Sequence, residues 1–139
     1  FSDCEVGFTI TTLDDEVRRV FEPEASPVVE RLKALKTINE AGIRTFVFLG
    51  PMLPYLSEKN LEELLVELAS IGVDRILVDR LNIKAGNWPP IKRAVEQNFP
   101  DLLQVFTSAL PEGSKYYEDL RLRVSKLAQH LNLPTYFCY

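Results

Sequence analysis

The same junction recurs along this chain: a helical pattern ends at Gly or Asn, and an apolar run follows at once. Gly42 stands at the junction in "KTINEAGIRTFVFLGP", Gly72 in "VELASIGVDRILVDRL" and Asn132 in "KLAQHLNLPTYFCY". Gly, and less readily Asn, ends helices in the left-handed backbone conformation. Helices that stop in this way and return directly to a strand are the repeating unit of α/β proteins. The sequence therefore predicts an α/β fold with a parallel sheet.

The helices between these junctions show apolar residues at spacings of three and four. One stripe follows Ser26 and Pro27, a second follows Ser57, and a third belongs to a long helix that starts near Ser114. The segment "PPIKRAVEQNF" predicts a shorter helix that ends at Pro100, and "DLLQVFTSAL" a further turn or helix.

Four short runs read as strands: "EVGFTIT", "RTFVFLG", "DRILVD" and, as a fourth, "TYFCY". The second and third are almost continuously apolar, which is typical of strands in a parallel sheet covered on both faces. Helices between them indicate right-handed βαβ crossovers. Three to four strands are too few for a closed eight-stranded barrel of about 250 residues. A small open sheet, or one part of a barrel, fits better.

Length and composition narrow the class of protein. With 139 residues, the chain is expected to form a single α/β domain over 1–139. The formal net charge of −4 argues against a free-standing binder of phosphate backbones. No apolar run reaches the roughly 20 residues that span a bilayer, so no membrane partner is expected. Two cysteines make no disulfide framework, which favours the cytoplasm. The absent initiator Met suggests a fragment of a larger protein.

The first strand alternates two kinds of side chain. One face carries Val6, Phe8 and Ile10, and the other carries Glu5, Gly7, Thr9 and Thr11. If the apolar face meets the helices, the threonine hydroxyls point to the opposite side, which in a barrel is the interior. There they could donate hydrogen bonds to a polar ligand. The alternative is a half-solvated edge strand in which Thr serves β propensity alone.

Three segments carry a resemblance to a known family. "VGFTITT", "FEPEASPVVERLKALKTINEAGI" and the strand ending in "GPMLPYL" resemble the second half of the spore photoproduct lyase-like (DNA repair photolyase) branch of the radical S-adenosylmethionine enzymes. Those enzymes have a similar strand, a Glu-Pro corner, a helix with an early Arg, and a strand that ends in a proline-containing turn. The resemblance covers about residues 5–56 and continues more loosely to the last residue.

The resemblance implies a partial TIM-like (β/α)6 barrel of which this chain is the C-terminal half. The family's Cys-x3-Cys-x2-Cys motif is absent, and Cys4 and Cys138 cannot replace it, because three clustered thiolates must converge on one cluster. S-adenosylmethionine and a [4Fe-4S] cluster are therefore expected in the full-length parent. Neither is expected to bind this chain alone, and no residue here is expected to ligate a metal. The implied partners are the missing N-terminal half and a nucleic-acid substrate of the parent lyase.

The resemblance also assigns candidate binding residues. Thr9 falls where a strand hydroxyl contacts the cofactor, and Thr11 is a second candidate. Arg31 is the early helical Arg, which would help to hold the cofactor carboxylate because a guanidinium fork matches that geometry. The alternative for Arg31 is an ion pair with Glu22 that clamps the loop onto the helix.

Further candidates follow the later strands, where the sites of α/β and barrel proteins gather. Asp79 and Asn82 come after the third strand and are predicted to bind substrate, with solvated loop charges as the alternative. Pro51, Met52 and Pro54 follow the second strand and either stiffen a ligand-binding loop or simply end the strand. No catalytic residue is identified, because the sequence contains no Gly-rich phosphate loop, Ser-His-Asp arrangement or zinc-ligand spacing.

Three functions remain open. The chain is part of a radical S-adenosylmethionine enzyme, or a non-catalytic α/β scaffold or binding module without the cluster half, or a fragment of another barrel enzyme that binds a phosphorylated ligand. An open half-barrel exposes strand edges and one sheet face. The isolated chain is therefore expected either to self-associate through its open sheet edge or to cover that edge with a terminal segment.

Overall fold

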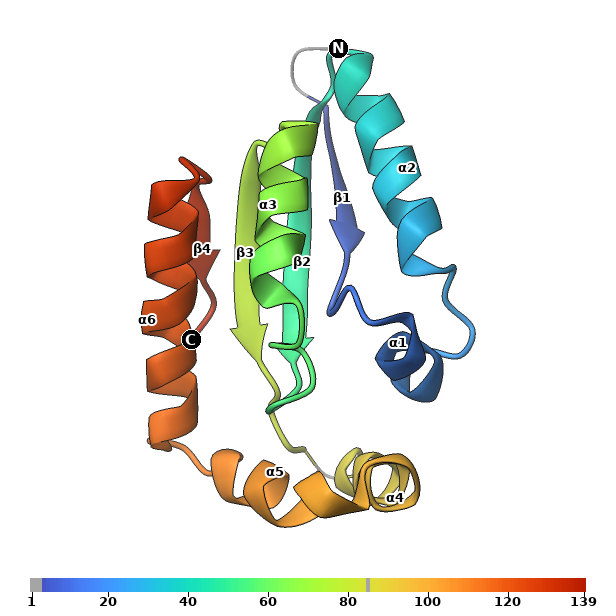
Figure 1. Ribbon diagram of the computed structural model, residues 1–139, viewed down its shortest axis with the longest axis vertical. Helices are drawn as coiled ribbons and strands as arrows, with labels where there is room; N and C mark the ends of the chain where they lie inside the picture. Colours follow the sequence, from blue (N-terminus) through green and yellow to red (C-terminus); the bar gives the residue numbers. More distant parts are fainter. Residues whose placement is uncertain (1–3, 85) are drawn as a thin grey trace.

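A computed structural model describes residues 4–84 and 86–139 and shows an α/β protein (Figure 1). Its strands and helices follow in the order β1 (Glu5–Thr9), α1 (Asp15–Phe21), α2 (Val28–Glu40), β2 (Arg44–Met52), α3 (Leu61–Ile71), β3 (Arg75–Arg80), α4 (Trp88–Asn98), a 3₁₀ turn (Pro100–Leu102), α5 (Leu103–Ala109), α6 (Lys115–His130) and β4 (Thr135–Phe137). The predicted α/β class is confirmed.

The four strands form one parallel sheet in the order β1-β2-β3-β4. Phe48 of β2 pairs with Leu77 of β3, and Leu77 in turn pairs with Tyr136 of β4. When neighbouring parallel strands follow one another along the chain, crossovers of one hand place every connecting helix on the same side of the sheet. Figure 1 shows this arrangement, with α2, α3 and α6 alongside one face of the sheet.

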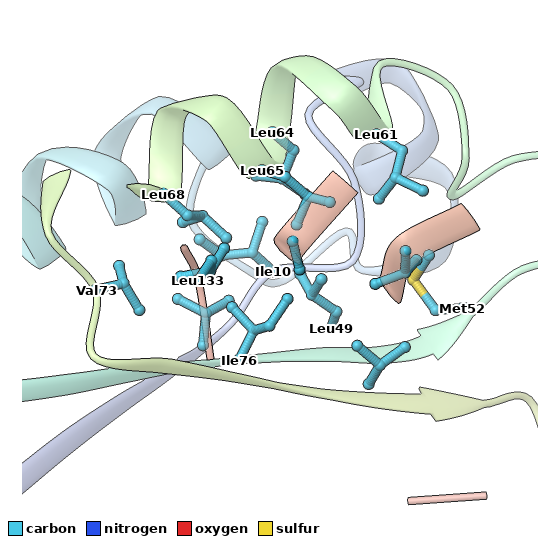
Figure 2. Packing of buried hydrophobic residues seen from close by; sticks show 14 of the residues in the cluster. Ile10, Leu49, Met52, Leu61, Leu64, Leu65, Leu68, Val73, Ile76 and Leu133 are labelled. Atoms are coloured by element: carbon cyan, nitrogen blue, oxygen red, sulfur yellow. The ribbon is translucent and has the colours of Figure 1, made fainter. Parts of the chain in front are cut away.

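The main core lies between that face and the three helices. Each strand contributes alternate residues, such as Val47 and Leu49 of β2 and Ile76 of β3, all of which are fully buried. Figure 2 shows the α3 side chains directed onto these strand residues, among them Leu65 and Leu68. Each fully buried aliphatic side chain stabilises the fold by about 1.5–3 kcal/mol relative to an exposed one. This packing aligns the carboxyl ends of the strands.

The helix stops expected from the sequence are confirmed. Gly42 and Gly72 have φ angles of 82° and 95°, and Asn132 has a φ of 54°. Gly72 ends α3, and its N–H donates to the carbonyls of Leu68 and Ala69 at the helix end. The reversal delivers the chain straight into β3.

A second, smaller core covers the carboxyl ends of the strands. Its buried members come from α1, α4, α5 and the segments that follow β2 and β3; they are Val17, Leu53, Leu56, Leu81, Val95 and Phe106. Figure 1 shows α4 and α5 beyond the arrowheads of β2 and β3. Of the helices between β3 and β4, α4 and α5 therefore cover the carboxyl end of the sheet, whereas α6 packs on its face.

The carboxyl end of each strand differs from the sequence prediction. β3 ends at Arg80, so Asp79 lies within the strand and not after it. β1 ends at Thr9, so Thr11 lies outside the strand, because the chain turns there toward the cap of α1 formed by Asp14. β2 runs on through Pro51 and Met52, which therefore belong to the strand.

In the part of the chain that the structure describes, no helix combines the length and apolar character needed to cross a membrane.

Candidate functional site

One face of the sheet carries apolar side chains that no described helix covers. Phe46 and Phe48 of β2 and Leu77 of β3 alternate with the core residues and so point away from the helices. All three are half-buried, and none belongs to either buried cluster. The prediction of strands covered on both faces is therefore wrong for the described residues, because all three crossing helices lie on one side. We call this surface the open face.

Two glycines let aromatic rings lie flat on the open face. A Cβ atom added to Gly7 would lie 2.0 Å from Cζ of Phe46, and one added to Gly50 would lie 2.6 Å from Cε1 of Phe48. Such distances are far below van der Waals contact, so any other residue would push the ring away. The two glycines therefore allow the rings of Phe46 and Phe48 to lie close against the strands of the open face.

An ion pair spans the open face near the amino ends of the strands. Nε of Arg75 on β3 lies 3.1 Å from Oε2 of Glu5 on β1, and the guanidinium stacks 5.0 Å from the ring centroid of Phe46 between them. The hydrogen bonds to Arg75 lower the pKa of Glu5, and those to Glu5 raise the pKa of Arg75. This end of the face is therefore charged, while its centre is apolar.

Thr9 lies on the open face and is exposed, next to Phe48 in the strand register. Its side chain makes no hydrogen bond with another described residue, while its backbone carbonyl accepts one from Nη1 of Arg31 at 2.7 Å. The hydroxyl thus faces the uncovered side, in the direction expected for a residue that lines a barrel interior.

Arg31 has another role on the opposite side of β1. Its side chain is 9% exposed; Nε donates to the carbonyl of Ser26 at 3.2 Å, and Nη1 lies 3.7 Å from Oε2 of Glu22. Nη2 is buried and has no hydrogen-bond partner among the described residues. This geometry matches the clamp that the sequence left open as the alternative: Arg31 ties the Glu-Pro loop and the end of β1 to α2. As arranged here, its guanidinium presents no accessible fork to a ligand carboxylate.

Thr11 does not share the surroundings of Thr9. It is 7% exposed and lines a cavity of about 190 Å³ beneath α1 and α4. The sequence placed both threonines on one face because it extended β1 to Thr11, whereas the strand ends two residues earlier.

Asp79 and Asn82 line a common cavity of about 540 Å³ at the carboxyl ends of β3 and β4. Oδ1 of Asp79 accepts from the backbone N–H of Arg80 at 2.9 Å, and the Asn82 side chain is exposed. Arg80 and Arg121 add positive charge to the same wall. The structure thus brings the two predicted substrate residues together, in a cavity whose lining does not include Thr9 or Thr11.

Tyr117 is a residue of this site that the sequence analysis missed. Its hydroxyl donates to the carbonyl of Met52 at 2.6 Å and accepts from the N–H of Leu81 at 3.2 Å. The guanidinium of Arg80 stacks on its ring at 4.5 Å, and burial raises its pKa to about 12. Tyr117 ties α6 to the ends of β2 and β3. In the sequence it reads as an ordinary residue of a helical stripe.

The cysteines flank the two outer strands of the sheet. Cys4 immediately precedes β1 and Cys138 immediately follows β4, and both are free and exposed. Among residues 4–84 and 86–139, no group of three or more His, Cys, Asp or Glu side chains could hold a metal ion. A [4Fe-4S] cluster needs clustered thiolates, and the two cysteines lie at opposite edges of the described sheet.

Comparisons with known proteins identify two longer relatives. The chain is 30% identical over 108 residues to an uncharacterized protein of Methanocaldococcus jannaschii (MJ0683), covering 78% of this chain and 40% of the relative. It is 29% identical over 127 residues to an uncharacterized protein of Acidianus two-tailed virus (ORF301), covering 79% of this chain and 42% of the relative. The chain thus spans about two fifths of the length of these relatives. No protein-family profile and no solved structure matches it.

Proposed function

We propose that this chain is the C-terminal portion of a radical S-adenosylmethionine enzyme of the spore photoproduct lyase-like branch. In the parent, a cluster held by the other half would reductively cleave S-adenosylmethionine to a 5′-deoxyadenosyl radical that abstracts hydrogen from a substrate, for which the family resemblance suggests a nucleic acid. The portion described here would supply one wall of the cofactor and substrate pocket. A cytoplasmic location, favoured by two unpaired cysteines, belongs to the same proposal.

The open face of the sheet is the observation that carries this proposal. Parallel sheets occur almost only with both faces covered, and here a row of apolar side chains, including Phe48 and Leu77, has no cover among the described residues. Both outer strands, β1 and β4, also have one unpaired edge in the described sheet. Strands in sequential order with their helices outside are the arrangement of a (β/α) barrel, so the missing cover would be the remaining strands of a barrel.

In this proposal the candidate residues have different roles. Thr9 offers a free hydroxyl on the inner wall, and Asp79 and Asn82 offer an acceptor and an amide at the carboxyl ends of the strands. Arg31 acts through Thr9, because it holds the carbonyl of that residue and so fixes the end of β1. In this proposal Arg31 therefore acts as a positioning residue.

A non-catalytic α/β scaffold is the second candidate. It is favoured because two arginines already have partners within the fold: Arg31 contacts Glu22 and the carbonyl of Thr9, and Arg75 is paired with Glu5. In that case the open face would be covered by a binding partner, and the chain would function without iron.

The test is to read the gene upstream of Phe1 and to express the whole reading frame without oxygen, with iron and sulfide. A Cys-x3-Cys-x2-Cys motif and formation of 5′-deoxyadenosine from S-adenosylmethionine and dithionite are expected. Replacing the three cysteines by alanine is the control and should abolish the product. An upstream segment without clustered cysteines would overturn the enzyme proposal, and a stable, iron-free protein would then support the scaffold.

A further inference from the structure

The pairing between β2 and β3 is irregular just before the carboxyl ends of both strands. Leu49 of β2 pairs with Val78 of β3. The next aligned pair is Met52 with Arg80, so β2 has one residue more than β3 over this stretch. Pro51 lies within it, and proline inside a central strand is tolerated at bulges because it has no N–H to give to a neighbour. The two strands are therefore joined through a β-bulge, a feature that redirects side chains and is common next to functional sites.

The bulge lies against Asp79, one of the two predicted substrate residues. A Cβ atom added to Gly50 in the bulge would lie 3.2 Å from Cβ of Asp79, a distance at which the neighbour must move. One oxygen of the carboxylate, Oδ1, also accepts a hydrogen bond from the backbone N–H of Arg80 at 2.9 Å. The shape of the bulge therefore limits where the Asp79 side chain can lie.

The hydroxyl of Tyr117 joins β2 and β3 at the point where their direct pairing ends. It donates to the carbonyl of Met52 at 2.6 Å and accepts from the N–H of Leu81 at 3.2 Å. Both contacts are buried, and a hydroxyl can donate and accept at the same time. One side chain of α6 thus satisfies a backbone group on each strand, and its loss would leave both groups without this partner.

Tyr117 is itself held from several sides. The residue is 2% exposed, the guanidinium of Arg80 lies 4.5 Å from its ring centroid, and the hydroxyl of Tyr139 donates to its backbone carbonyl at 3.1 Å. Burial raises the pKa of Tyr117 to about 12, so near neutral pH the hydroxyl keeps the proton that it donates to Met52. The ring and its hydroxyl therefore give the two strand ends a fixed attachment to α6.

Both predicted substrate residues lie next to this attachment. Asp79 directly precedes Arg80, the last residue of β3, and Asn82 directly follows Leu81, whose N–H is held by Tyr117. Asp79, Asn82 and Tyr117 line the same cavity of about 540 Å³. A change in the spacing of the strand ends would therefore move the two side chains relative to each other.

We propose that Tyr117 is a positioning residue of this cavity: its hydroxyl sets the spacing between the ends of β2 and β3, and thereby the separation of the Asp79 and Asn82 side chains. The inference rests on the proposed role of these two residues in binding substrate. The side-chain positions are measured without substrate or cluster, so the result does not depend on whether the parent is a radical enzyme.

The experiment compares two variants by NMR of the isotope-labelled protein. Tyr117→Phe keeps the buried ring and removes only the hydroxyl. Tyr116→Phe is the matched control, because its hydroxyl also accepts one backbone N–H, that of Tyr55 at 2.9 Å, in the loop after β2. The signals followed are the carboxyl carbon of Asp79 and the side-chain amide of Asn82.

In Tyr117→Phe both side-chain signals should shift. The amide of Leu81 should also exchange with solvent about tenfold faster, relative to the amide of Val47, because it has lost its acceptor. In Tyr116→Phe all of these signals should stay as in the unaltered protein. A role in stability alone would weaken the fold in both variants without moving the Asp79 and Asn82 signals.

Unchanged Asp79 and Asn82 signals in Tyr117→Phe, or equal changes in Tyr116→Phe, would overturn the proposal. If Tyr117→Phe does not fold, the unaltered protein decides the matter. The hydroxyl proton of Tyr117 should then give a slowly exchanging signal with a nuclear Overhauser contact to the amide of Leu81, and the lack of that contact would equally overturn the proposal.

Discussion

The ring of Phe46 lies directly on Gly7 of the neighbouring strand, so that a Cβ atom at position 7 would sit 2.0 Å from Cζ of the ring. The two residues are paired in the strand register, and Arg75 stacks on the same ring from the next strand. Gly7 is thus required by a close contact and not by its backbone angles. The contact fixes the position of the Phe46 ring, on which Arg75 stacks while it pairs with Glu5.

The first prediction follows from this contact. Gly7→Ala should destabilise the protein by about 1–3 kcal/mol, because the ring must leave its position and the stacked Arg75 must move with it. Urea unfolding monitored by circular dichroism measures the change. In the double variant Gly7→Ala/Phe46→Ala the two effects should be strongly non-additive, since the clash is gone. Additive losses would show that Phe46 does not rest on Gly7.

The second prediction concerns the clamp at Arg31. Arg31→Met keeps much of the side-chain volume but removes the donors to the carbonyls of Thr9 and Ser26, and should cost about 2–4 kcal/mol of unfolding free energy. Glu22→Gln should cost less than about 1 kcal/mol, because that ion pair is long and partly solvated.

Arg19→Met, at a side chain that is 67% exposed, is the matched control and should be nearly neutral. If Arg31→Met were as mild as this control, the clamp would not hold the end of β1.

The third prediction is a pH dependence. The pKa of Glu5 in the folded protein lies below its ordinary value of 4.5 because of its hydrogen bonds to Arg75, and the pKa of Asp15 is lowered by its bonds to Arg18. Depressed carboxyl pKa values contribute stability that is complete above the unfolded-state pKa and is lost as the pH falls through the folded-state pKa. Stability should therefore decline below about pH 4.5.

Unfolding in urea at a series of pH values tests this. Glu5→Gln and Asp15→Asn should each flatten the acid limb of the curve, and Glu24→Gln, an exposed residue of the Glu-Pro loop with no ion pair in the described structure, should not. Because both pairs are partly solvated, added salt should reduce the effect. If neither Glu5→Gln nor Asp15→Asn changes the loss of stability at low pH, these two ion pairs do not cause that loss.

The fourth prediction concerns association of the isolated chain. The apolar open face and the unpaired edges of β1 and β4 should make it self-associate at micromolar concentrations, as measured by sedimentation velocity. Leu77→Glu places a charge at the centre of the open face and should shift the distribution toward monomer.

Leu122→Glu, on a residue of α6 that is 63% exposed, serves as the matched control and should leave association unchanged. A clean monomer of the unaltered chain at all concentrations would contradict the prediction.

Local sequence determined the strands of this fold, their direction and most of its helices, although the helix α1 was not predicted. The helix stops at Gly42, Gly72 and Asn132 are visible because left-handed backbone favours few residue types, and the apolar runs after them already implied parallel strands. The face on which Thr9 lies followed from the two-residue period of a strand. Asp79 and Asn82 were placed at one site because both lie at the carboxyl end of the third strand, where the sites of α/β proteins gather.

Tertiary structure alone decided the rest, because it depends on contacts between residues far apart in the chain. The end of β1 is set by the turn into α1, which moved Thr11 from the open face into a cavity. The use of Arg31 as a clamp depends on a carbonyl 22 residues away in the sequence, and the role of Tyr117 on backbone groups more than 30 residues away. The helices cover one face only because all crossovers pass on the same side, which no local pattern encodes.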